Sequence, residues 1–272
     1  MNKIFNSKLT YQIFSFLIPL IVYIKTLAPT VTFIDSGELA AVASKLGVAH
    51  PTGYPLFTII GNIFTKLPFG DEVYRLNLMS AVISSLALLM FFNLLTFIFL
   101  KLNLPDENKP AVKKIQNSVY YNISLASVLI LAFSKTFWDT ANAIEVYSLH
   151  TFFLITNIYL FLKANNNNSE DKESYLQGEK NWLLFAFVLG LSFTNHLSTI
   201  FLSVGFLYLY FAVNGFNKTS FTRILILAVP FLLGYSVYFY LFARAENPVP
   251  VSYTHLRAHE TKANLVCRLL LE

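Results

Sequence analysis

Two carboxylates close together are the first residues of this chain that could perform chemistry. Asp35 and Glu38 stand three positions apart within residues 30–38, so both lie on one face of a helix that begins there. An ionised carboxylate at a membrane interface can accept the proton of a hydroxyl group. The spacing also fits a structural role, because Asp35 as the N-cap and Glu38 at the third helical position would form a capping box. In both interpretations a helix start holds the two carboxylates in place.

His50 is the second candidate, and it stands in a segment that predicts a rigid turn. Residues 49–56 contain two prolines and a glycine, which together favour a tight, well-defined backbone path. Such a turn would bring the imidazole near Asp35, where it could bind a phosphate or a hydroxyl together with backbone N–H groups. The alternative is a turn that ends a helix and carries its histidine by chance.

Residues 137–147 supply the third candidate group. Glu145 is a further carboxylate at the expected depth of the first pair, and Tyr147 fits a belt of aromatic residues at the membrane interface. His150 follows about one turn later, where an idle lipid-facing histidine would be unusual. The alternative for this segment is helix capping, with Asn142 and Glu145 as the capping pair.

The fourth candidate group is a polar cluster inside a long apolar stretch. Residues 190–198 contain His196, and a polar cluster in such surroundings is a functional hypothesis by default. The alternative is hydrogen bonding between helices through Ser192, Thr194 and Asn195.

The composition indicates which elements must position these groups. Hydrophobic residues make up 55% of the 272 residues and charged residues 13%, whereas an average soluble domain carries about 25% charge. This composition excludes a disordered chain and argues against a lone soluble domain, and it predicts an all-α, multipass transmembrane protein. The net charge of +5 reflects membrane orientation, because no basic run with interleaved aromatic residues indicates a nucleic-acid partner.

The apolar stretches predict about seven membrane spans. Residues 182–213 are too many for one span of about 20 residues, so we predict two spans joined by a polar turn near His196. The loops on the same side of the membrane as the N-terminus hold most of the Lys and Arg, which predicts that the N-terminus is cytoplasmic. All four polar clusters then share the outer face. The expected spans are residues 9–27, 76–100, 119–133, 146–162, 182–213 as a pair, and 224–242.

The first loop on the outer face, residues 28–75, is unusually long. It is rich in Gly, Pro, Thr and aromatic residues and too apolar for disorder, which is typical of a functional loop. Within this loop, residues 39–46 predict a short interfacial helix. We therefore expect the chemistry of the protein to take place on the outer face.

Four segments of the chain together resemble a known family. They are TLAPTVTFIDSGELAAVASKLGVAHPTGYPL, RLNLMSA, FWDTANAIEVYSLH and LGLSFTNHLSTIF. They resemble the bacterial membrane family called domain of unknown function 2723, which is related to animal plexin-type protein O-mannosyltransferases within the GT-C glycosyltransferase superfamily. The segments follow the family order, and the resemblance covers about residues 9–250. It implies a GT-C-like transmembrane module over residues 1–250.

This resemblance also implies an activity and residue roles. The enzyme would be an inverting glycosyltransferase in the inner membrane, moving a sugar from a polyprenyl-phosphate carrier to an acceptor protein or glycan outside the cytoplasm. Asp35 would be the catalytic base, with Glu38 beside it. The leaving phosphate needs positive partners or a divalent metal, for which no ligands are assigned. The resemblance suggests His50, Arg75 and His196 as the positive partners, and Glu145 and Tyr147 as residues that shape the donor site.

Residues 251–272 differ in character from the rest of the chain. They resemble a translated sequencing adapter, which predicts a truncated transmembrane module followed by an artefactual tail. The alternative is a metal-binding tail that uses His255, His259 and Cys267. Two other functions also stay open, a membrane transporter and an inactive fragment of the enzyme. Transporters typically place polar groups near the membrane midplane and contain an internal sequence repeat, and this sequence indicates neither feature.

Overall fold

The structure is a computed structural model that describes residues 7–32, 35–102, 110–166 and 172–245. Within these ranges every regular element is a helix, which confirms the predicted all-α class. The tail predicted over residues 251–272 lies outside the described residues. That prediction, and the metal-binding alternative for the same segment, therefore stay untested.

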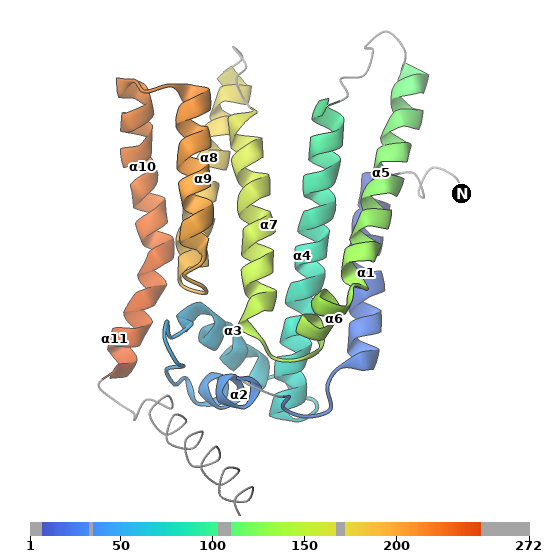
Figure 1. Ribbon diagram of the computed structural model, residues 1–272, viewed down its shortest axis with the longest axis vertical. Coiled ribbons are helices and arrows are strands. Elements are labelled where there is room, and N and C mark those ends of the chain that lie inside the picture. The colour runs from blue at the N-terminus through green and yellow to red at the C-terminus, as the bar shows by residue number, and fades with distance from the viewer. Residues whose placement is uncertain (1–6, 33–34, 103–109, 167–171, 246–272) are drawn as a thin grey trace, which may run out of the picture.

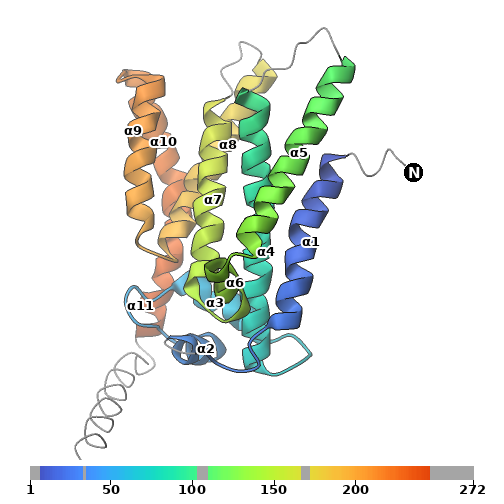
Figure 2. The ribbon, with the colours of Figure 1, turned by 45° about the vertical axis from the view of Figure 1, so that its right-hand side comes forward.

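The long helices run side by side along one direction of the molecule (Figures 1 and 2). They are α1 (Lys8–Thr26), α4 (Glu72–Leu102), α5 (Pro110–Ala132), α7 (Val146–Asn165), α8 (Lys172–Phe193), α9 (Thr199–Asn214) and α10 (Lys218–Tyr235). α4 packs against α1, α5 and α7, and α8 packs against α7 and α10. Helix α9 begins after a break at residues 194–198, which confirms the polar turn predicted within the long apolar stretch.

The apolar helices identify a membrane protein, although the predicted number of seven spans is not confirmed. Three described segments are long and apolar enough to cross a membrane, namely α1, α4 and Lys218–Arg244. A fourth results if the pair formed by Asn117–Ala132 and α6 (Lys135–Asn142), bent by 69°, is one span. Large apolar side chains on α10, such as Leu225 and Val229, are exposed, as expected of a face that contacts lipid.

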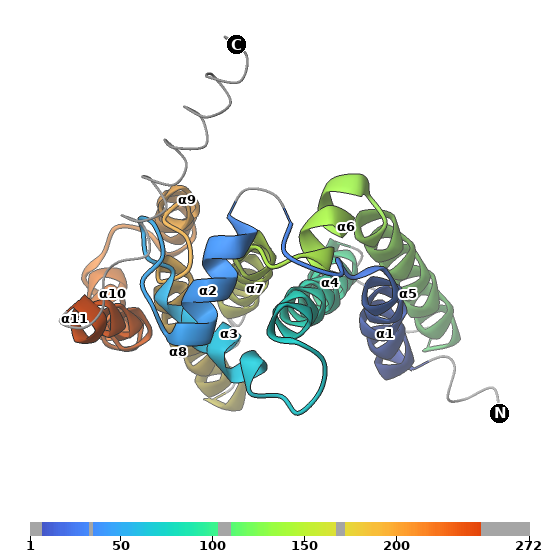
Figure 3. The same ribbon diagram turned by 90° about the horizontal axis from the view of Figure 1, so that it is seen from below.

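Short helices form a layer at one end of the bundle (Figure 3). They are α2 (Ser36–Lys45), α3 (Pro55–Thr65) and α6. The 3₁₀ turn η1 (Ser236–Tyr238) and α11 (Phe239–Ala245) continue α10 to the same end of the bundle. Helix α2 contains the predicted interfacial helix, which begins earlier than expected. Helices α3 and α6 were not predicted from the sequence. The signal for α3 was Pro55 at its first position followed by apolar residues at helical spacing.

A buried apolar cluster fastens α2 and α3 to the bundle. Its members come from α2, α3, α4 and α7 and include Leu39, Val42, Phe57, Leu76 and Met79, all at most 2% exposed. Burying one such side chain away from water stabilises the folded state by about 1.5–3 kcal/mol. The long first loop is therefore a folded layer with its own packing, and it can hold side chains in fixed positions.

Candidate active site at the end of the bundle

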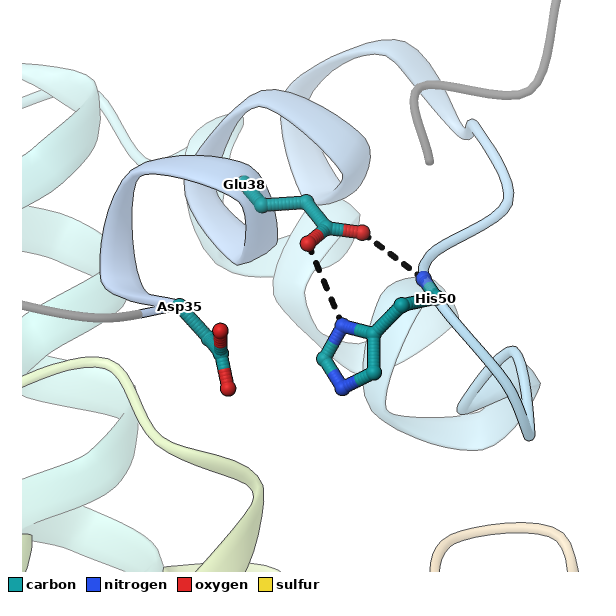
Figure 4. Close-up of side chains that lie close together, drawn as sticks. All are labelled: Asp35, Glu38 and His50. Atoms are coloured by element: carbon teal, nitrogen blue, oxygen red, sulfur yellow. Dashed lines mark hydrogen bonds and ion pairs between the residues drawn. The ribbon is translucent and has the colours of Figure 1, made fainter. Parts of the chain in front are cut away.

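Glu38 and His50 form the centre of the site (Figure 4). Glu38 Oε1 accepts a hydrogen bond of 2.7 Å from the backbone N–H of His50, and Glu38 Oε2 lies 3.1 Å from His50 Nδ1. The Glu38 side chain is 4% exposed, whereas that of His50 is 32% exposed. A buried carboxylate thus holds both the backbone and the ring of a partly accessible histidine.

Asp35 stands at the N-cap position of α2, but its side chain makes no capping hydrogen bond. Glu38, the other half of the expected capping box, contacts His50 instead. The capping-box interpretation is therefore wrong. The hydroxyl of Ser36 accepts a hydrogen bond of 3.2 Å from the backbone N–H of Thr32 near this helix start. Asp35 is half-buried and its carboxylate points toward the imidazole of His50.

The turn after His50 places Tyr54 against the imidazole. Tyr54 Oη lies 3.1 Å from His50 Nε2, and the two rings meet edge to face at 5.1 Å. Tyr54 has a φ of 42°, a left-handed conformation that is uncommon for a side chain of its size. Burial, followed by the nearby Tyr147, Asp35 and Glu38, raises the pKa of Tyr54, so its hydroxyl stays protonated at neutral pH.

Helix α11 supports this turn from the far end of the chain. Tyr240 donates a hydrogen bond of 2.9 Å to the carbonyl of Gly47, and Arg244 Nε donates one of 2.7 Å to the carbonyl of Leu46. Leu46 is the C-cap of α2, where a guanidinium group complements the negative end of the helix dipole. A side chain at Gly53 would meet Leu241 of α11.

Asn142 and Glu145 do not form the predicted capping pair. Asn142 ends α6, its carbonyl accepts a hydrogen bond of 3.0 Å from Ala28, and its Oδ1 lies 3.2 Å from Thr26 Oγ1. Glu145 is the N-cap of α7 without a side-chain capping bond. Burial, and secondly the charge of Asp35, raise the pKa of Glu145, while His50 opposes this effect. Glu145 therefore lies close enough to Asp35 and His50 to interact with their charges.

His196 extends the site toward α7 and α9. Its ring lies 6.4 Å from Tyr54 and 5.7 Å from Tyr147 between ring centroids. Its Nδ1 lies 2.8 Å from Ser198 Oγ, which in turn lies 3.1 Å from His150 Nε2. Burial lowers the pKa of His196, so the ring is neutral near pH 7. Ser198 closes the polar cluster predicted over residues 190–198, but only His196 of that cluster was predicted as a site residue.

Arg75 is the one predicted site residue that the structure binds elsewhere. Its guanidinium group donates to the carbonyls of Leu67 and Asp71, in the turn that precedes α4. These bonds fix the end of the first loop and do not reach Asp35 or His50. The structure thus brings six of the seven predicted site residues together at one end of the bundle: Asp35, Glu38, His50, Glu145, Tyr147 and His196.

Asp35, Glu38 and His50 lie close enough together to be compared with the ligands of a divalent cation. One donor atom from each of Asp35, Glu38 and His50 lies within 4.8 Å of the other two. Both oxygens of Glu38, however, already face nitrogen atoms of His50 at hydrogen-bond distance. Glu38 and His50 thus form a hydrogen-bonded pair with Asp35 beside it, and this pairing argues against a metal centre.

An apolar cavity of about 350 Å³ lies between α7, α8, α9 and α10. Aromatic side chains make up nearly half of its lining, namely Phe161, Trp182, Phe185, Phe206, Tyr210 and Phe231. Several of these rings meet edge to face, as Trp182 and Tyr210 do at 5.3 Å. The cavity suits an extended hydrocarbon better than a sugar.

The chain is similar to known proteins over most of its length. The family model described as protein O-mannosyl-transferase TMEM260 N-terminal domain matches residues 35–220. The chain is 28% identical over 209 residues to protein O-mannosyl-transferase TMEM260 of Mus musculus, covering 76% of this chain and 26% of that protein. It is 27% identical over 230 residues to protein O-mannosyl-transferase tmem260 of Dictyostelium discoideum, covering 82% of this chain and 26% of that protein. No solved structure matches the chain.

These matches confirm the predicted relation to protein O-mannosyltransferases. All seven predicted site residues fall within the matched residues 35–220. The chain spans about a quarter of the length of both relatives. The bacterial family name and the superfamily stay predictions.

Proposed function

Because this chain belongs to the protein O-mannosyl-transferase TMEM260 N-terminal domain family, we propose that it acts as a membrane glycosyltransferase. The donor is a sugar on a polyprenyl-phosphate carrier, and the acceptor is a hydroxyl group, most simply a Ser or Thr of a protein. The observation that carries this proposal is the grouping of Asp35, Glu38 and His50 at the end of a bundle of apolar helices. A water-soluble acceptor and a lipid-linked donor can meet at such a position.

The chemistry proposed for Asp35 follows from its lack of a capping bond. A carboxylate that caps no helix is available to accept the acceptor proton as the hydroxyl attacks the sugar. Glu38 stands beside it as the second carboxylate. The attack displaces the phosphate from the opposite face of the anomeric carbon, so the mechanism is inverting.

The leaving phosphate needs donors that stabilise its charge. His50 and His196 border the site and can supply N–H groups, whereas Arg75 would first have to leave its carbonyl partners. Glu145 and Tyr147 then shape the donor side of the site. The aromatic cavity between α7 and α10 accommodates part of the prenyl chain.

In this proposal the site faces the outside of the inner membrane, the N-terminus lies in the cytoplasm, and the long helices form a GT-C-like module of about seven spans. Residues 1–250 form that module. The grouping of the polar residues at one end favours a transferase over a transporter, whose polar groups lie near the membrane midplane.

The test uses the protein in liposomes with a labelled polyprenyl-phosphate sugar and a Ser/Thr-containing acceptor. We expect Asp35→Asn to abolish most transfer. The matched control is Asp139→Asn, because Asp139 is an exposed carboxylate of α6 paired only with Lys135 among the described contacts. Equal transfer by Asp35→Asn and wild type would remove Asp35 as the base. A wild type without transfer would contradict the enzyme proposal and favour the transporter or inactive-fragment alternatives.

A further inference from the structure

The contacts of His50 determine which of its ring nitrogens carries the proton. Glu38 accepts the backbone N–H of His50 on one oxygen, so the carboxylate is placed to accept the ring N–H on its other oxygen. A proton on Nδ1 leaves Nε2 of the neutral ring with a lone pair. Tyr54 Oη, 3.1 Å away, then donates its hydrogen to that lone pair.

This arrangement changes what Glu38 can do. Both of its oxygens face His50 and its side chain is 4% exposed, so a substrate hydroxyl cannot reach it without breaking this contact. His50, in contrast, is 32% exposed and directs a basic nitrogen away from Glu38. A carboxylate that orients a histidine and stabilises its charged form is the arrangement by which many enzymes make imidazole a base.

We propose that His50 is a further catalytic residue of this site, a general base that Glu38 positions and whose Nε2 is held by Tyr54 until an acceptor hydroxyl replaces the phenol. This inference rests on the proposed function, and it offers His50 in place of Asp35 as the group that accepts the hydroxyl proton. Glu38 becomes a positioning residue instead of a second base, and His50 no longer serves the leaving phosphate, which is left to His196.

The acceptor O–H bond breaks and its proton moves to His50 Nε2, while the acceptor oxygen forms a bond to the anomeric carbon. The bond between that carbon and the phosphate oxygen breaks, and the phosphate leaves with the electron pair. The imidazolium formed at His50 is paired with the Glu38 carboxylate, which lies 3.1 Å from Nδ1.

Charged and titratable groups surround His50 on all the elements packed around it. They will contribute to the pH dependence of the transfer rate. Asp35 and Glu38 come from the start of α2, and Tyr54 precedes α3. Glu145 precedes α7 and interacts with the charge of His50. The remaining groups near the turn are Tyr147, His196, Tyr238, Tyr240 and Arg244.

The first test measures the tautomer directly and needs no activity. ¹⁵N chemical shifts of the histidine rings are recorded in labelled protein in liposomes, and the His50 signals among the five histidines are assigned by their loss in His50→Gln. We expect a protonated Nδ1 and a bare Nε2 at neutral pH. We also expect Glu38→Gln to abolish this preference, while Asp139→Asn preserves it. A bare Nδ1 in the wild type would overturn the inference.

The second test measures transfer against pH. We expect His50→Gln to lower kcat/KM by about 100- to 10,000-fold, the usual contribution of a general base. The wild-type rate should rise with pH on the acid side of its profile, a limb that Asp35→Asn keeps and His50→Gln loses. Glu38→Gln should lower kcat more than it raises KM, and Glu38→Asp should restore part of the rate.

The two proposals fail in different ways. Wild-type rate and pH profile in His50→Gln would contradict the role of His50 and leave the transferase standing. A wild type without transfer would contradict the transferase proposal, and the ¹⁵N shifts would still show whether Glu38 sets the tautomer of His50.

Discussion

The side chain of Asn77 on α4 accepts a hydrogen bond of 2.8 Å from the backbone N–H of Ile144. Its amide nitrogen donates one of 2.9 Å to the carbonyl of Ala28. Asn77 is fully buried, so this one side chain joins the segment before Asp35 to the segment before Glu145. The distance between the carboxylates of Asp35 and Glu145 therefore depends on Asn77, which contacts neither of them.

We expect Asn77→Ala to destabilise the protein by about 1–3 kcal/mol, because it leaves the buried N–H of Ile144 and the carbonyl of Ala28 without their partner. The measurement is thermal unfolding in detergent. Asn166→Ala serves as the control, since Asn166 is exposed at the C-terminal end of α7. An unchanged unfolding temperature in Asn77→Ala would show that the two segments are held by other contacts.

The pKa of Glu145, raised by burial and by Asp35, predicts how stability depends on pH. Between its ordinary value of 4.5 and its raised value, the folded state binds more protons than the unfolded state. The contribution of Glu145 to the free energy of unfolding therefore falls as pH rises through that window, and it becomes constant above the raised pKa. We expect Glu145→Gln to remove this part of the pH dependence.

Unfolding temperatures of wild type and Glu145→Gln across pH 4–8 provide the measurement for that prediction. The difference between the two proteins should grow in favour of the variant as pH rises. Parallel curves would mean that Glu145 ionises in the folded protein as it does in water.

The crossing of α8 and α10 depends on two glycines. A Cβ at Gly190 would collide with the backbone oxygen of Phe231, and one at Gly234 with that of Phe187. Small residues allow this close approach of helix backbones in membranes. We expect Gly190→Ala and Gly234→Ala each to cost about 1–3 kcal/mol through overpacking.

Gly205 of α9 offers the matched control for these substitutions. A Cβ there would meet no atom within 4 Å, so Gly205→Ala should be neutral or slightly stabilising, since alanine favours a helix. Unfolding in detergent compares the three variants. A loss of stability in Gly205→Ala equal to that in Gly190→Ala would refute the packing explanation.

Much of the architecture could be predicted from patterns of neighbouring residues. The apolar stretches predicted α1, α4, α7 and α10 to within a few residues at most ends, and the polar cluster around His196 predicted the break before α9. Helices α3 and α6 were missed because both lie in segments that the sequence analysis treated as loop. Their short length gives a weak periodic signal.

The capping predictions were wrong for a different reason. Spacing shows that Glu38 could reach back to its own helix start, but it does not show that His50 offers two donors to the same carboxylate. Competition between a local and a distant partner depends on where the chain returns. Asn142 likewise bonds the distant Thr26, whereas Arg75 is held by carbonyls of its own turn and does not reach the site.

The sequence by itself determined the class of protein, most helix positions and the residue types available for chemistry, because hydrophobicity and helical spacing are properties of contiguous residues. Only the tertiary structure decided that Glu38 holds His50, that Tyr54 covers its free nitrogen, and that His196 and Glu145 face the same end of the bundle. Those relationships depend on how α2 and α3 fold back onto α4 and α7. That packing is set by the buried cluster around Phe57 and Leu76, whose members come from distant parts of the chain.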